Sequence, residues 1–145
     1  MSFAALIAAA LLASAQTPMP PIGQRTAAPQ QMLQGLAAGL SEEEAAIAAA
    51  QSRPLGTMDN PVRVGGPEGE QAYLARLRCG DGSTPSIGQP AAMGAGAFGS
   101  LVDGYPLDCG QAAPGRFTLV MDKYHDEHRE ERAPAGFTIL PRASQ

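Results

Sequence analysis

The stretch that decides the fold is RFTLVM, residues 116–121. Apolar side chains recur at every second position, so that Phe117, Leu119 and Met121 share one face. This period of two is typical of a strand that is buried on one side. We therefore expect a strand here, with that face forming one wall of the core.

Shorter segments on either side also have the composition of strands and are bounded by Gly or Pro. They are NPVRV (60–64), SLVD (100–103), YPLDC (105–109) and GFTIL (136–140). Short strands joined by turns are expected to form an antiparallel sheet. The Ala- and Gly-rich residues 88–99 predict a mobile loop between two of these strands.

Residues 67–79, PEGEQAYLARLRC, fit both the helical and the strand period. Their ends favour a helix, because Pro67 stands at the first turn, acidic residues follow it, and two arginines precede Gly80. Upstream, Ser41 and Glu44 have the spacing of a capping box and predict a helix over 41–51. A second helix is expected near 31–39.

These elements predict an α+β fold, in which a small antiparallel sheet is covered on one face by one or two helices. The composition changes along the chain and suggests five segments. They are a signal peptide (1–15), a flexible Pro- and Gln-rich tether (16–31), a helical segment (32–53), a compact domain (54–141) and a tail (142–145).

The signal peptide is inferred from an apolar run that ends in Ala13-Ser14-Ala15, the small-residue pattern that signal peptidase cleaves. The run is too short to span a membrane, and it lacks the basic residues that usually precede it. We expect a periplasmic or secreted mature chain without a transmembrane span. The net charge of −4 argues against nucleic acid as a partner.

Cys79 and Cys109 are the two cysteines of the chain, and in an exported protein an even number predicts a disulfide. A redox-active pair would more often be spaced C-x-x-C. Zinc binding by both cysteines with His125 and His128 has suitable residue types, but it lacks the close cysteine pair of zinc modules. The disulfide is the favoured interpretation.

The densest group of chemically active side chains is residues 121–132. On a helical turn Asp122, His125 and His128 would lie along one face, where they could bind a divalent cation or supply a general base. A solvated, charge-balanced loop explains the same residues better. In that interpretation Tyr124 packs and the histidines are exposed.

Two other patterns carry less weight. Residues 94–99 spell G-x-G-x-x-G, but a dinucleotide site needs a strand before this motif and a helix after it. We therefore expect part of the mobile loop, which could still expose backbone amides to a partner. Ser100, Asp103 and His125 could be combined into a catalytic triad, as could similar trios in any chain of this size.

Four motifs together carry a resemblance. They are NPVRV (60–64), YLARLRCxDG (73–82), DxYxLDCG (103–110) and MDxYH (121–125). In this combination the chain resembles an uncharacterised family of small exported bacterial proteins over residues 54–140. The resemblance implies a domain boundary near residue 54 and a disulfide between the two cysteines. It implies no activity, so no functional residue is transferred from it.

We expect a non-enzymatic domain without a cofactor, which binds an unknown envelope protein or has a structural role. The alternative is a small hydrolytic or metal-binding protein that uses Asp122, His125 and His128. The two differ in the surroundings of the histidines. The first expects them to be exposed and unpaired, whereas the second expects at least one to be buried beside a carboxylate at a cleft.

Overall fold

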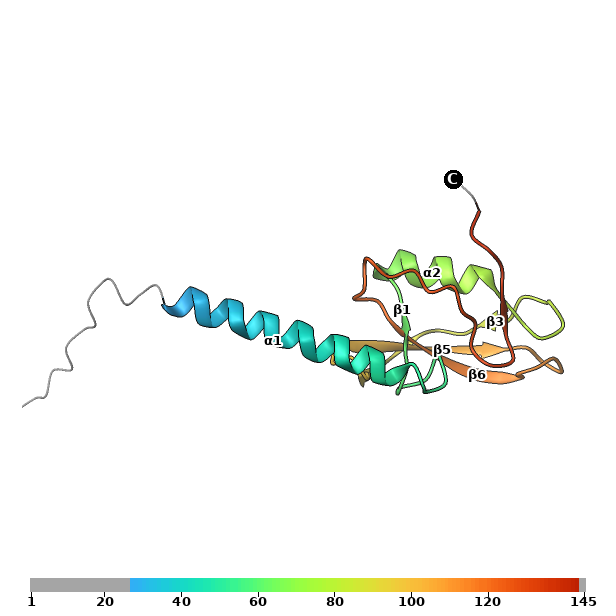
Figure 1. The fold of residues 1–145 in the computed structure, drawn as a ribbon. Coiled ribbons are helices and arrows are strands. Elements are labelled where there is room, and N and C mark those ends of the chain that lie inside the picture. The colour runs from blue at the N-terminus through green and yellow to red at the C-terminus, as the bar shows by residue number, and fades with distance from the viewer. Residues whose placement is uncertain (1–26, 144–145) are drawn as a thin grey trace, which may run out of the picture. The chain divides into compact units, whose positions relative to one another are not determined.

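The computed structural model describes residues 27–143 (Figure 1). The predicted signal peptide and the first part of the predicted tether, up to residue 26, lie outside the described residues. The chain divides into two units between Leu36 and Ala37, and the second unit contains the sheets, the disulfide and both histidines. The predicted limits of the tether and of the domain stay predictions.

The N-terminal described element is one helix, α1 (Ala27–Ala50), where we expected two. The capping box does not form, because Ser41 lies inside the helix and its hydroxyl donates to the carbonyl of Ala37 (3.0 Å). Gly35 and Gly39 each disfavour a helix by about 1 kcal/mol relative to Ala. The alanines around them have the highest helix propensity of all residues, and the helix continues through both glycines.

The main sheet has five strands in the order β1-β6-β5-β3, with β4 paired to the other end of β5. The strands are β1 (Val62–Arg63), β3 (Ser86–Ile87), β4 (Ala91–Ala95), β5 (Leu101–Asp108) and β6 (Arg116–Asp122). All pairs are antiparallel except β1 with β6, which is parallel. The predicted α+β class is therefore confirmed, with one parallel pair added to it.

Residues 67–79, whose sequence fits both the helical and the strand period, contain a helix followed by a strand. Helix α2 (Gly66–Arg76) confirms the predicted helix, but it ends three residues before Cys79. Strand β2 (Leu77–Arg78) follows at once and pairs with β7 (Thr138–Ile139) in a small second sheet. The Nε atom of Arg76 also donates to the carbonyl of Leu140 (2.7 Å). The helix ends at Arg76 because the following residues pair with the C-terminal segment.

The core lies between α2 and the sheet. Tyr73 and Leu74 of α2 are buried in the same cluster as Leu119 and Met121 of β6, so the predicted inward face of residues 116–121 is confirmed. Tyr105 of β5 completes this layer, because it is paired with Leu119. Val120 and Asp122, near the end of β6, point to the opposite face of the sheet and are buried as well.

The predicted mobile loop at residues 88–99 is wrong in part, because Ala91–Ala95 form β4. The strand pairs antiparallel with β5 from Ala91↔Gly104 to Ala95↔Leu101, with a shift in register at Met93. Ala and Gly have low strand propensity. The strand forms because the edge of β5 offers unpaired backbone groups to this segment.

The predicted disulfide between Cys79 and Cys109 is present, with 5.7 Å between the Cα atoms. It joins the end of β2 to the end of β5 and thereby links the small sheet to the main sheet. Within residues 27–143, no helix has the length and hydropathy that a membrane span requires.

Replacing both cysteines by Ala is expected to lower the free energy of unfolding by about 3–4 kcal/mol, because the disulfide closes a loop in the unfolded chain whose ends are 30 residues apart. Urea denaturation followed by circular dichroism measures this difference. The reduced wild-type protein is the control and should match the double variant. A difference below about 1 kcal/mol would contradict the stabilising role.

Candidate functional site

The chain leaves β6 in an extended conformation, not as a helical turn. The amide of His125 donates to the carbonyl of Val64 (3.1 Å), and Tyr124 forms a bridge with Gly65. The helical turn on which Asp122, His125 and His128 would share one face, considered as an alternative from the sequence, therefore does not form.

Asp122, the last residue of β6, is fully buried and is contacted from three sides. Its Oδ2 accepts a hydrogen bond from the hydroxyl of Ser100, and its Oδ1 accepts one from the amide of Tyr124 (3.1 Å). The Nε2 atom of His125 lies 3.3 Å from Oδ2, close enough for an ion pair. Asp122 thus connects β6, the turn before β5 and the loop after β6.

His125 is buried, with 8 % of its side chain exposed, whereas Tyr124 is 59 % exposed. The expectation of a packed tyrosine and exposed histidines is therefore wrong for both residues. The backbone hydrogen bond with Val64, directly after β1, holds His125 against the sheet. Its ring packs edge-on against Phe98, with 5.5 Å between centroids. Its Nδ1 atom lies 3.3 Å from Oε1 of Glu43 in α1.

His128 belongs to a different group of side chains. Its Nε2 atom lies 3.4 Å from Oε2 of the buried Glu130. Arg132 binds the same carboxylate with two nitrogen atoms, Nε at 2.9 Å and Nη2 at 3.0 Å. In the described part of the chain, no group of three His, Cys, Asp or Glu side chains is arranged to hold a metal ion.

Burial alone would raise the pKa of Asp122, but the contacts with His125, Ser100 and the Tyr124 amide outweigh it and hold the pKa below its usual value. Its contribution to stability is therefore present above the ordinary pKa and is lost as pH falls through the lowered one. For Glu130, burial also raises the pKa, but hydrogen bonds from Arg132 outweigh it and lower the pKa to about 2.

A shallow hollow of about 400 Å³ lies beside this network. Burial lowers the pKa of Arg63, whose guanidinium lies 5.9 Å from the centre of the Phe98 ring. Burial, with a smaller contribution from Arg63, lowers the pKa of His128. The lining residues are Arg63, Tyr124, His125, Asp126, Glu127 and His128.

This geometry does not form the triad considered from the sequence. The Ser100 hydroxyl donates to Asp122 and not to His125, and both ring nitrogens of His125 already face carboxylates. Asp103 pairs instead with Lys123 (2.6 Å). The hydroxyl already donates to Asp122, and Nε2 of His125 makes no hydrogen bond among the described residues, so the serine is not hydrogen-bonded to the base that would activate it. The network acts as a clamp between α1, the residues before β5, and β6.

The G-x-G-x-x-G motif is split between strand and turn. Gly94 lies in β4, and Gly99 lies in a turn where its φ is +86°. Strand β5 follows, where a dinucleotide site would require a helix.

A second polar cluster lies between α2 and the sheet. The buried Glu70 accepts a hydrogen bond at Oε2 from the hydroxyl of Tyr105 (2.9 Å), while its Oε1 atom is buried without a partner among the described residues. Burial raises the pKa of Glu70, and it raises the pKa of Tyr105 to about 12. When Glu70 is ionised, its buried charge lowers the stability of the folded state.

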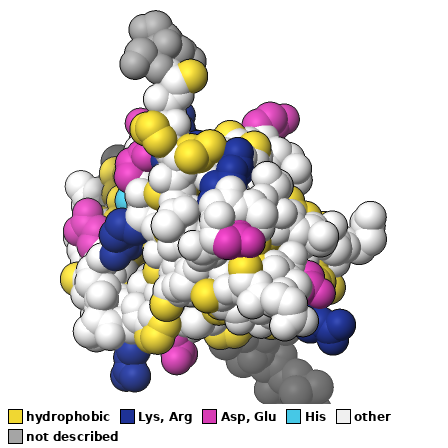
Figure 2. Space-filling view, turned by 90° about the vertical axis from the view of Figure 1, so that its right-hand side faces the viewer, with side chains coloured by type: hydrophobic (Ala, Val, Ile, Leu, Met, Phe, Trp, Pro, Cys, Tyr) yellow, Lys and Arg dark blue, Asp and Glu magenta, His cyan; other side chains and the backbone are white. Residues whose placement is uncertain are grey.

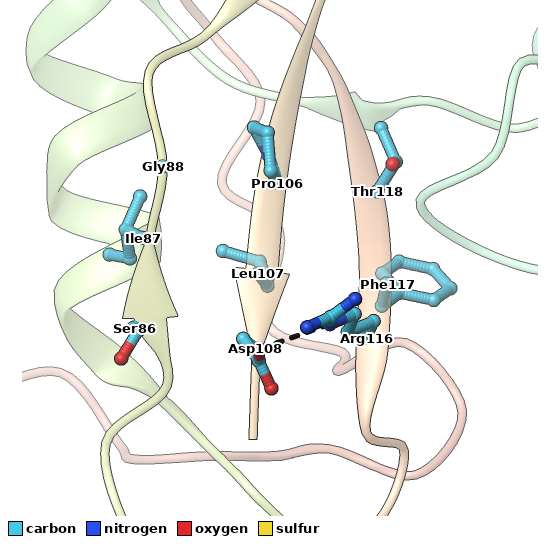
Figure 3. A pocket seen from close by; sticks show the side chains of 9 residues that line it. All are labelled: Ser86, Ile87, Gly88, Pro106, Leu107, Asp108, Arg116, Phe117 and Thr118. Carbon is cyan, nitrogen blue, oxygen red and sulfur yellow. Dashed lines mark hydrogen bonds and ion pairs between the residues drawn. The ribbon is translucent and has the colours of Figure 1, made fainter. Parts of the chain in front are cut away.

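A groove of about 540 Å³ crosses the sheet, and its lining residues all come from β3, β5, β6 and the residue after β3 (Figure 3). Its floor is β5, with Pro106 at the centre, and its walls are β3 and β6. At one end, Asp108 and Arg116 form an ion pair between neighbouring strands (3.3 Å). The lining residues are Ser86, Ile87, Gly88, Pro106, Leu107, Asp108, Arg116, Phe117 and Thr118. Sequence reasoning missed this groove, because β3 carries no strand signal.

The surface visible in Figure 2 has no continuous basic patch, since its Lys and Arg side chains are separated by acidic and uncharged ones. Comparisons with models of protein families, with curated proteins and with solved structures find no match for this chain. The resemblance to exported bacterial proteins stays a prediction.

Replacing Asp122 by Ala is expected to lower the free energy of unfolding by about 3–5 kcal/mol, because it leaves Ser100 and His125 without their buried partner. Chemical denaturation at neutral pH measures the change. Glu127→Ala removes an exposed carboxylate five residues later and should change the stability by less than about 0.5 kcal/mol. Equal effects of the two substitutions would contradict the clamp.

Replacing Glu70 by Gln is expected to stabilise the protein increasingly as pH rises above 4.5, the ordinary pKa of the side chain. The raised pKa means that the folded state binds a proton more tightly than the unfolded state, so the wild-type protein loses stability as that proton leaves. Urea denaturation of both proteins at several pH values tests this. A stability difference that does not change with pH would contradict the raised pKa.

Proposed function

We propose that this chain is an exported, disulfide-stabilised domain that binds a protein partner in the bacterial envelope without catalysing a reaction. The observation that carries the proposal is the groove over β3, β5 and β6. It is concave, it combines apolar side chains such as Ile87 and Pro106 with a polar rim, and it lies on the sheet face opposite α2. Exposed surfaces of this kind are typical of sites for protein partners.

The groove has a rigid floor, which supports binding over a purely structural role. Six residue pairs join β5 to β6, and the disulfide fixes Cys109 directly after the last of them. At the rim, the Gly110 amide and Arg116 lower the pKa of Asp108 and keep it ionised. A pre-organised surface loses little conformational entropy on binding.

Two features support export. A disulfide forms and persists in an oxidising compartment such as the periplasm. The Ala13-Ser14-Ala15 pattern after an apolar run is what signal peptidase would cleave. The proposed partner is therefore an envelope protein.

A second candidate is acid–base chemistry at His125. The observation in its favour is that this histidine is buried beside carboxylates at the wall of a hollow, as expected for an enzyme. Against it, each ring nitrogen lies 3.3 Å from a carboxylate oxygen, and the clamp accounts for the same contacts. If His125 were catalytic, His125→Gln would abolish an activity while preserving stability; we expect the reverse pattern, in which stability falls.

A photo-crosslinking amino acid at Thr118 tests the groove in the cell. Thr118 is exposed at the wall of the groove, so we expect one discrete adduct with an envelope protein after irradiation. The same amino acid at the exposed Glu127, outside the groove, is the control. The adduct should disappear when Pro106→Arg, in a correctly folded protein, places a long charged side chain in the groove.

Mass spectrometry identifies the adduct, and circular dichroism verifies that the variants are folded. Identical adducts from Thr118 and Glu127, or no adduct from either position, would contradict binding through the groove.

A further inference from the structure

The outer edge of the main sheet is unprotected. Strand β4 pairs with β5 on one side, and no strand among residues 27–143 pairs with its other side. All five of its residues are exposed, and residues 88–100 contain no charged side chain. Natural sheets usually protect such edges with charges, prolines or bulges, because unpaired backbone groups attract another strand. Here Pro90 and the irregularity at Met93 limit the length of the edge but leave it uncharged.

Large apolar side chains are exposed along the same edge. Leu101, which opens β5 opposite Ala95, is 63 % exposed, and Ile87 and Met93 are 44 % and 41 % exposed. A second strand placed beside β4 would cover part of this apolar surface. The edge therefore offers both backbone hydrogen bonds and hydrophobic contact.

The charge distribution and the small side chains favour a second copy of this chain as the occupant. Each copy has a net charge of −4, which opposes association over most of the surface, but the β4 edge contributes none of it. Three of the five residues of β4 are Ala and one is Gly, so two β4 strands can approach without side-chain clashes. Antiparallel pairing is self-complementary about a twofold axis, as a symmetric dimer requires.

We propose that β4 pairs antiparallel with β4 of a second copy and joins the two main sheets into one. A contact between two strands of five residues is smaller than a standard interface of about 1,600 Å². The exposed side chains beside it extend the contact, and we expect a reversible dimer with a Kd on the order of 10 µM. A twofold axis perpendicular to the sheet places both grooves on the same face of the dimer. This inference does not depend on the proposed partner.

Sedimentation velocity of the oxidised chain from residue 16 onward, from about 1 to about 500 µM, tests the proposal. We expect a monomer–dimer equilibrium for the wild-type protein. The double variant Ala91→Lys/Ala95→Lys places like charges on both edges and should weaken the dimer at least tenfold. Ala72→Lys/Ala75→Lys adds the same charge on the exposed side of α2 and should leave the dimer unchanged.

A second pair of variants with opposite charge distinguishes repulsion between two β4 edges from a disturbance of the strand by charge. Ala91→Glu/Ala95→Glu alone should be monomeric, and an equimolar mixture with the lysine variant should form a heterodimer. Near-UV circular dichroism shows whether each variant is folded. A wild-type protein that is monomeric at every concentration would overturn the proposal. So would a dimer that survives both edge variants, or one that only the α2 variant disrupts.

Discussion

The antiparallel ladder between β5 and β6 is the constraint on which the rest of the structure depends. It runs from Asp103↔Met121 to Asp108↔Arg116, and each remaining strand of the main sheet attaches to one side of it. Helix α2 packs on one face of the ladder, and the disulfide holds its end at Cys109. Asp122 continues β6 past the ladder and becomes the centre of the polar clamp. The core, the groove and the clamp therefore share one rigid frame.

The strands predicted correctly are those whose own side chains determine their burial. Leu119 and Met121 alternate with less apolar residues and point to the core, so the local pattern was sufficient to find β6. Strand β4 has no such pattern, because Ala91–Ala95 contain one large side chain and a Gly. Its conformation depends on the exposed edge of β5, a tertiary cause that a local window of sequence does not contain.

The disulfide and the histidines illustrate the same difference. Cys79 had a single possible partner, so the compartment alone predicted the pairing. His125 was misjudged because its neighbours in sequence are charged, whereas the residues that enclose it, Glu43 and Phe98, come from distant segments. One local signal was available. Asp122 directly follows a buried apolar run, and a carboxylate in that position needs partners that neutralise it.

Charged side chains are concentrated at the clamp, whereas the proposed partner groove and the proposed dimer edge of β4 are mainly apolar. Near the clamp, carboxylates and bases lie side by side: Asp122 and Glu43 each have an oxygen 3.3 Å from a ring nitrogen of His125, and Arg132 binds Glu130. Pairs of this kind stabilise the fold and hold the side chains in fixed positions. The groove lies at the other end of β5, with the Asp108–Arg116 ion pair at its rim. Strand β4 pairs with the end of β5 nearer the clamp, but it carries no charged side chain and takes no part in the ion pairs. Binding at the groove or at the β4 edge would remove water mainly from apolar side chains and from backbone groups that a second strand can hydrogen-bond. The desolvation free energy of binding is therefore lower there than at the clamp, where charged groups would lose water.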